Sequence, residues 1–394
     1  MYGEANVNQK GFHMQGFQIS PQALNAEQAE TIKATLPAVG AAIEDITKNF
    51  YQRMFTAHPE LLANTFNRGN QAQGAQQKAL AASVATFATY LVSENTKSPD
   101  SLLSRIGHKH VSVGIRPDQY PIVHKHLFDA IEEVLTPEVF QGEVRAAWDA
   151  VYKEMERVLI DFESDLYQER EVAPGEVFLN TVVAKREELD PNTVRFQLDT
   201  TLDFKPGQYI SVRQTLSDGA QQLRQYSLVN APGTPLEFVV RKVNDDPQGE
   251  VSTQLCQHLQ VGDELEISLP AGDLTLGEHE RIVLVSSGIG ATPMVGMLAA
   301  LQGSQQQVAV YHQDKSELAD VLRPQRERYL KGIANSSHTV AYRPERLSLE
   351  VAPDAHVYLC GGTDFLQAMR EQLGHLPAEQ LHFELFHPND WLLA

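Results

Sequence analysis

The spacing of apolar residues changes twice along this chain of 394 residues, and each change points to a different kind of fold. Over residues 25–167, apolar side chains recur every three or four positions, which is typical of amphipathic helices. Asn25 precedes an acidic first turn and is a candidate helix cap. The clearest helical stretches are 39–55, 79–91, 122–134 and 148–166. We therefore predict an all-α first part.

After residue 171 the pattern becomes one of short β-branched runs separated by turns. One short helix is expected among them, at 251–258. Closely spaced strands of this kind are typical of an antiparallel barrel or sandwich. The expected strands are 177–185, 193–198, 209–213, 225–229, 236–242 and 264–269.

From residue 281 onwards, apolar strands alternate with helices. Such alternation indicates a parallel sheet that helices cover. The expected elements are 282–285, 293–301, 308–312, 356–360 and 363–373. We thus predict a multi-domain chain: all-α, then antiparallel β-barrel, then α/β with a parallel sheet. The expected divisions are an N-terminal tail at 1–24, then domains at 25–170, 171–277 and 278–394.

Composition narrows the classes of function. The 32 basic and 51 acidic residues give a net charge of -19, which disfavours binding to nucleic acid or to an anionic membrane surface. Two cysteines, Cys256 and Cys360, are too few for a disulfide framework or a cysteine-rich metal site. No apolar run is long enough for a membrane span, and the N-terminus lacks the apolar region of a signal peptide. We expect a cytoplasmic protein.

A glycine-rich segment, 286–294, follows the apolar strand 282–285 and opens a helix. Its glycines allow the backbone to approach a pyrophosphate, and the helix start supplies free N–H groups. A tight turn without a ligand is the alternative. Cys360 ends a later strand, at the edge where open α/β sheets bind ligands, although a lone cysteine is more often a buried small hydrophobe.

In the predicted barrel, Arg224-Gln225-Tyr226-Ser227 combines a guanidinium, an aromatic ring and a hydroxyl on one strand. These groups suit a phosphate and an aromatic cofactor, but an ordinary exposed strand could also contain them. Gly249-Glu250-Val251-Ser252 opens the short helix and offers N–H groups for a second phosphate.

Taken in order, these motifs over residues 171–394 resemble those of the ferredoxin-reductase superfamily. The resemblance implies that FAD and a nicotinamide cofactor bind here, with Cys360 near the nicotinamide and Phe386 over the flavin ring. The flavin-binding residues that it implies are Tyr209, Arg224, Gln225, Tyr226 and Ser227. Those for the NAD(P)H pyrophosphate are Gly288, Ile289, Gly290, Ala291, Thr292 and Pro293. The segment around Phe386 comprises Glu384, Leu385, Phe386, His387 and Pro388.

The helical part contains two His-x-His pairs, at 108–110 and 124–126. Helical residues two apart point about 200° away from each other, so neither pair can hold one ion. Several segments of the helical part nevertheless resemble the globin domain of flavohaemoglobins. The matching segments are 50–55, 58–61, 66–67, 70–71, 79–80, 109–110 and Tyr120.

The resemblance extends over residues 25–388 and implies a globin followed by an FAD barrel and an NAD domain. It implies nitric oxide dioxygenase activity, with haem b, FAD and NADH or NADPH as cofactors, O₂ and nitric oxide as small-molecule partners, and no obligate protein partner. His110 would be the proximal iron ligand. Lys109 would modulate the haem potential, and Tyr120 and Glu163 would form a proximal relay. The implied distal residues are Tyr51, which donates a hydrogen bond to O₂, Gln76 and Leu80, which line the pocket, and Phe66, which packs on the porphyrin.

Two other functions remain open at this point. An oxygen carrier or sensor with its own reductase has no need of a proximal relay, and a general flavin reductase has no need of the distal residues. Leu385 and His387 stand where the family usually has Cys and Gly, whereas Glu384 matches it.

Overall fold

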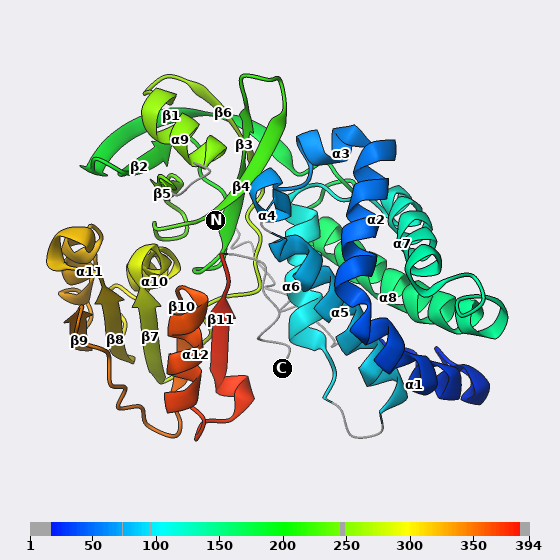
Figure 1. Cartoon of the computed structure of the whole chain (residues 1–394). Helices are drawn as coiled ribbons and strands as arrows, with labels where there is room; N and C mark the ends of the chain where they lie inside the picture. Colours follow the sequence, from blue (N-terminus) through cyan, green and yellow to red (C-terminus); the bar gives the residue numbers. More distant parts are fainter. Residues whose placement is uncertain (1–16, 73, 94–96, 245–248, 387–394) are drawn as a thin grey trace, which may run out of the picture.

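The structure is a computed structural model that describes residues 17–72, 74–93, 97–244 and 249–386. In Figure 1 a bundle of helices lies beside two sheets, one above the other. The helices of the bundle are α1 (Ala26–Ala41), α2 (Ile43–Ala57), α3 (Pro59–Asn64), α4 (Arg68–Ala72), α5 (Ala75–Val92), α6 (Asp100–Ser112), α7 (Tyr120–Leu135) and α8 (Gly142–Glu169). The predicted all-α part is confirmed.

The helical bundle begins at the expected cap. The side chain of Asn25 accepts a hydrogen bond from the Gln28 backbone N–H at 2.8 Å, and the Asn25 backbone N–H donates to Gln28 Oε1 at 3.0 Å. One apolar core joins the bundle, since α1 packs on α8 and α2 packs on α7. Trp148 is 2% exposed in this core and donates to Thr35 Oγ1 at 3.0 Å.

The second part is a six-stranded antiparallel sheet with the order β4-β3-β6-β1-β2-β5. A bridge between Leu228 and Phe238 joins the chain after β4 to β5, so the two edges meet and the sheet closes as a barrel. Helix α9 (Glu250–His258) packs against this sheet. The strands are β1 (Phe178–Asp190), β2 (Thr193–Leu198), β3 (Tyr209–Thr215), β4 (Gln221–Ser227), β5 (Glu237–Arg241) and β6 (Glu264–Ser268).

The third part is a five-stranded parallel sheet with the order β11-β10-β7-β8-β9. Its strands are β7 (Arg281–Ser287), β8 (Gln307–Asp314), β9 (Asn335–Tyr342), β10 (His356–Cys360) and β11 (Leu381–Glu384). Its helices are α10 (Ala291–Ala300), α11 (Arg323–Leu330) and α12 (Thr363–Gln372). The edge strands β9 and β11 were not predicted, because β9 starts with polar residues and β11 has only four.

Both faces of the parallel sheet are covered, which explains its continuous apolar strands. Ile282 and Leu284 on β7 belong to the core that α10 covers. Val283 and Val285 face the opposite way, into the core that α12 covers. Among the described residues, no helix combines the length and apolar character needed to cross a bilayer.

Candidate functional site

His110, near the end of α6, lies against a buried acid on α8. Nδ1 of His110 is 2.7 Å from Oε1 of Glu163 and 3.1 Å from the Tyr120 hydroxyl. Tyr120 donates to the same carboxylate oxygen at 2.6 Å. When Nδ1 donates to the carboxylate, Nε2 of His110 keeps its lone pair, as a metal-ligating imidazole requires. The three residues expected on the proximal side thus form one hydrogen-bonded group.

The other histidines of the two His-x-His pairs have separate partners. Nδ1 of His108 accepts from the Gly272 backbone at 3.3 Å, and burial lowers the pKa of His108 to about 3. His124 lies 2.7 Å from Asp149, whereas His126 packs edge-on against His58. Neither pair converges on one point, as helical geometry predicted.

A second polar group surrounds Tyr51 on α2. The Tyr51 side chain is 4% exposed, and its hydroxyl lies beside the side-chain amides of Gln76 and Gln71. Burial raises the pKa of Tyr51 well above its usual range, so its hydroxyl remains a proton donor at neutral pH. Phe66 meets the Tyr51 ring edge-on, with the centroids 5.9 Å apart. The predicted distal residues Tyr51, Gln76 and Phe66 therefore lie together.

An apolar cavity lies within the bundle, and the fourth expected distal residue, Leu80, lines it. Leu127, Ile131 and Val151 line the same cavity. Neither His110 nor Tyr51 lines this small cavity, so the fit to a haem rests on the donor set. An imidazole with an available Nε2, a buried phenol donor and apolar surroundings are the components that a haem pocket requires. The residues of the helical part thus fit a haem.

Arg224 is the central cation of the barrel site on β4. Its guanidinium is partly buried and donates to the Leu223 carbonyl at 2.8 Å and to Gln222 Oε1 at 3.3 Å. Burial is the main cause that lowers the pKa of Arg224. Both acceptors are neutral, so a phosphate would provide Arg224 with a better partner than either of them. The chemistry of Arg224 therefore fits the diphosphate of a flavin dinucleotide.

The remaining predicted flavin residues lie on β4, which carries Arg224, and on the neighbouring strand β3. Tyr209 on β3 is opposite Ser227 on β4, and both side chains are buried. Tyr226 packs on Phe238 with the ring centroids 5.5 Å apart. Gln225 donates to Ser211 Oγ at 2.8 Å. Tyr209, Gln225, Tyr226 and Ser227 thus join Arg224 on one part of the barrel.

Lys109 is one of the residues through which the helical bundle contacts the barrel. Its Nζ donates to Gln225 Oε1, which connects the residue before His110 to the flavin strand. The Lys109 side chain is otherwise exposed, and the charges of Arg224 and Glu384 act on it. Glu384, at the end of β11, is 6% exposed, and burial together with Asp273 raises its pKa to about 7. A cation and a buried acid therefore lie at this junction.

The glycine-rich turn lies at the carboxyl edge of the parallel sheet, where α10 begins. Gly288 has φ +54°, in the left-handed region that favours glycine. A Cβ at Gly290 would lie 2.5 Å from the Cys360 carbonyl oxygen, so only glycine allows this approach of α10 to β10. Thr292 Oγ1 donates to the Ile289 carbonyl at 3.0 Å. The predicted pyrophosphate residues are thus adjacent to the predicted nicotinamide neighbour, Cys360. The rest of that set, Ala291 and Pro293, is buried in the first turn of α10.

The end of the described chain contains Phe386, the residue predicted to lie over the flavin ring. Cys360 is paired with Glu384 in the sheet, which places the start of this segment beside the glycine-rich turn. Leu385 packs against the core on the α12 side, and Phe386 is 40% exposed. His387 and Pro388 lie outside the described residues.

Three polar residues near these groups were not predicted from the sequence. Gln71 lies beside the Tyr51 hydroxyl, and Ser211 Oγ accepts a hydrogen bond from the Gln225 amide. Asp273 contributes to the raised pKa of Glu384 and lies 3.4 Å from Arg105. No local motif marks these residues, because each is brought to its partner by tertiary packing.

Comparison with known proteins assigns the helical part and the barrel to families. The globin family matches residues 48–159, and the family described as oxidoreductase FAD-binding domain matches residues 180–276. A flavohemoprotein of Halalkalibacterium halodurans is 34% identical over 408 residues, which covers 94% of this chain and 98% of that protein. The chain belongs to the flavohaemoprotein family. A flavohemoprotein of Chromobacterium violaceum is 36% identical, and the match covers 93% of this chain and 100% of that protein.

A solved flavohaemoglobin has the same overall architecture. The crystal structure from Malassezia yamatoensis, which has bound FAD and haem, superposes with a TM-score of 0.85 at 30% identity. The superposition covers 92% of this chain and 99% of the Malassezia yamatoensis chain. The flavohaemoprotein architecture of a globin, an antiparallel FAD-type sheet and a parallel NAD-type sheet is therefore confirmed for this oxidoreductase. The exact domain boundaries stay predictions.

Proposed function

We propose that this flavohaemoprotein is a nitric oxide dioxygenase that binds haem b, FAD and NADH or NADPH. The observation that carries the proposal is the pairing, within one globin, of the His110–Glu163–Tyr120 group with the buried Tyr51 donor. When bound, the cofactors supply hydride acceptance from NAD(P)H, one-electron transfer, and the conversion of nitric oxide and O₂ to nitrate.

The chain's own residues tune and position this chemistry. Glu163 accepts the His110 Nδ1 proton in a hydrogen bond, which makes Nε2 a stronger electron donor to a ligated iron. A simple oxygen carrier has no need of this electron donation, so the group favours an enzyme. Arg224 would hold the flavin diphosphate, and the start of α10 would hold the pyrophosphate of NAD(P)H.

Tyr51 provides a hydrogen-bond donor in the globin, and the junction between the parts of the chain contains a group that can exchange a proton. The buried Tyr51 hydroxyl lies beside Gln76 and Gln71 and stays protonated, so it can stabilise negative charge that develops in the pocket. Burial raises the pKa of the Glu384 carboxyl to about 7, so this group can hold or release a proton near neutral pH. The cytoplasmic location and the absence of an obligate protein partner stay predictions.

Replacement of Tyr51 by phenylalanine tests the proposal. Because loss of one preorganised donor commonly costs about 10²-fold in rate, we expect nitrate formation by Tyr51→Phe to fall at least about tenfold. We also expect faster O₂ release in stopped-flow measurements, with unchanged haem and FAD content. Tyr90→Phe removes a tyrosine hydroxyl elsewhere in the bundle and should leave both rates unchanged. Wild-type rates in Tyr51→Phe would mean that Tyr51 only fills the core.

A further inference from the structure

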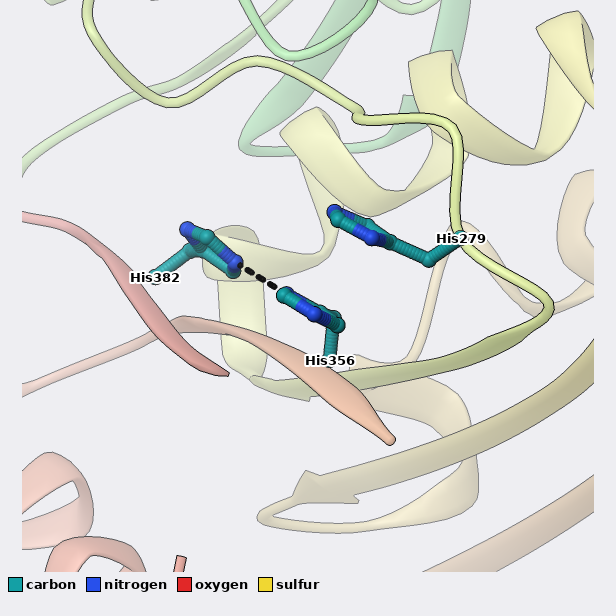
Figure 2. A group of neighbouring side chains, drawn as sticks. All are labelled: His279, His356 and His382. Carbon is teal, nitrogen blue, oxygen red and sulfur yellow. Dashed lines mark hydrogen bonds between the residues drawn. The ribbon is translucent and has the colours of Figure 1, made fainter. Parts of the chain in front are cut away.

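Three histidines from separate segments meet at the amino edge of the parallel sheet. His279 lies in the connection that leads into β7, His356 is the first residue of β10, and His382 is the second residue of β11. Figure 2 shows their imidazole rings side by side between these segments. One ring nitrogen of each lies within 4.8 Å of those of the other two.

The rings are held close without a carboxylate among them. Nδ1 of His356 is 3.1 Å from Nε2 of His382, and the His279 ring stacks on the His356 ring at 3.4 Å with an interplanar angle of 5°. All three side chains are partly buried. Neutral imidazole is the form of histidine that ligates metals.

The backbone near His279 leaves space for its ring. A Cβ at Gly277 would lie 2.4 Å from Nε2 of His279, so a residue with a side chain would displace the imidazole. The Gly277 N–H donates to the Tyr358 hydroxyl at 2.9 Å, which ties this connection to β10. The Tyr358 ring in turn stacks on His382, with the centroids 4.6 Å apart. The position of the cluster therefore depends on contacts outside the three histidines.

The surrounding charge favours a cation. The exposed acids Glu278 and Glu280 flank His279 in the sequence. The nearby cation Arg281 is paired with Asp354 at 3.2 Å, which offsets its repulsion. Exposed carboxylates on the same segment as His279 raise the local concentration of metal cations.

We propose that His279, His356 and His382 bind one divalent transition-metal ion of the zinc type, with water completing the coordination. Zinc accepts imidazole nitrogens at about 2.0–2.1 Å in a tetrahedral arrangement, which separates two ligand nitrogens by about 3.3 Å. The His356–His382 nitrogen separation of 3.1 Å is close to this value. The ion would replace their shared hydrogen bond, and rotation of the stacked His279 ring would supply the third nitrogen.

The position of this site separates it from the redox chemistry. Cys360, beside the proposed nicotinamide site, ends the same strand that His356 begins, so about 13 Å of β10 separates the two. The ion would tie the connection from the barrel to strands β10 and β11. Its expected effect is stabilisation of the parallel-sheet domain, and the proposal does not depend on nitric oxide dioxygenase activity.

Calorimetric titration with Zn²⁺ tests the proposal on the protein loaded with haem and FAD, after treatment with EDTA and its removal. We expect one Zn²⁺ site that His279→Gln, His356→Gln and His382→Gln each weaken. Loss of an outer partner of a metal ligand costs about 10–100-fold, so loss of a ligand should cost at least about tenfold. The exposed His375, in the same domain, provides the control His375→Gln, which should bind as the wild type does. Equal binding by all variants, or no binding by the wild type, would overturn the proposal.

Two further measurements do not require removal of a histidine. Gly277→Ala keeps all three ligands but displaces the His279 ring, so it should also weaken Zn²⁺ binding, with FAD content unchanged. X-ray absorption at the zinc edge of the wild type with one equivalent of Zn²⁺ should show three imidazole nitrogens at about 2.0 Å. A shell of oxygen ligands alone would mean that the histidines only pack on one another.

Discussion

Replacement of His110 by alanine is expected to abolish haem binding while FAD remains bound. His110 is the one histidine of α6 whose Nδ1 is held by a carboxylate, which leaves Nε2 available to iron. The reductase residues around Arg224 lie on the barrel, so loss of the iron ligand should leave them unchanged. The measurements are the Soret absorbance of the purified variant and its FAD content after release by heat.

The control for this variant is His124→Ala. His124 is partly exposed, belongs to the other His-x-His pair and is held by Asp149, so its removal should leave the Soret band intact. Added imidazole should restore part of the haem binding in His110→Gly, because it can occupy the vacated position. A normal Soret band in His110→Ala would show that another residue ligates the iron.

Replacement of Arg224 by alanine is expected to release most of the FAD. A hydrogen bond to a charged group contributes about 1.5–3 kcal/mol, which corresponds to about 10- to 100-fold in affinity. The measurement is the fraction of FAD retained after gel filtration, with a titration of the remaining affinity. Haem content should stay at the wild-type level, since the helical bundle is unchanged.

Arg213→Ala is the matched control on the neighbouring strand. Arg213 already has a partner in the structure, because it is paired with Glu266 at 2.8 Å and lies over the Phe178 ring. It should retain a full complement of FAD even if its melting temperature falls. A full complement of FAD in Arg224→Ala would remove Arg224 from the flavin site.

The sequence predicted the fold well where hydrophobic periodicity is strong. Residues 148–166 lie within α8, and residues 282–285 lie within β7, because one is a long amphipathic stripe and the other a buried apolar run. The strand expected at 225–229 instead occupies Gln221–Ser227, since polar Gln221 and Gln222 conceal its start. The edge strands β9 and β11 escaped prediction because an edge strand needs less apolar surface.

The candidate site could be predicted where its residues are consecutive in the sequence. Arg224 to Ser227 and Gly288 to Pro293 are motifs that one strand or turn presents together. By contrast, the resemblance to flavohaemoglobins, and not periodicity, singled out Tyr51 and Glu163. Asp273 belongs to neither kind of signal, because only the packed chain brings it to its partners.

The histidine cluster shows the same limit. His279, His356 and His382 are far apart in the sequence and have no metal-ligand spacing. The parallel register of β7, β10 and β11 aligns the amino ends of these strands, and this alignment creates the cluster. No pattern in one segment could have predicted it.

Nitric oxide consumption in air by the protein loaded with haem and FAD is the measurement that tests the proposed function most directly. It should be made with NADH and then with NADPH, and the nitrate formed should be counted. We expect rapid consumption that depends on the nicotinamide cofactor and yields one nitrate per nitric oxide. Normal reduction of haem and flavin without nitrate would contradict the proposal and favour an oxygen carrier or sensor.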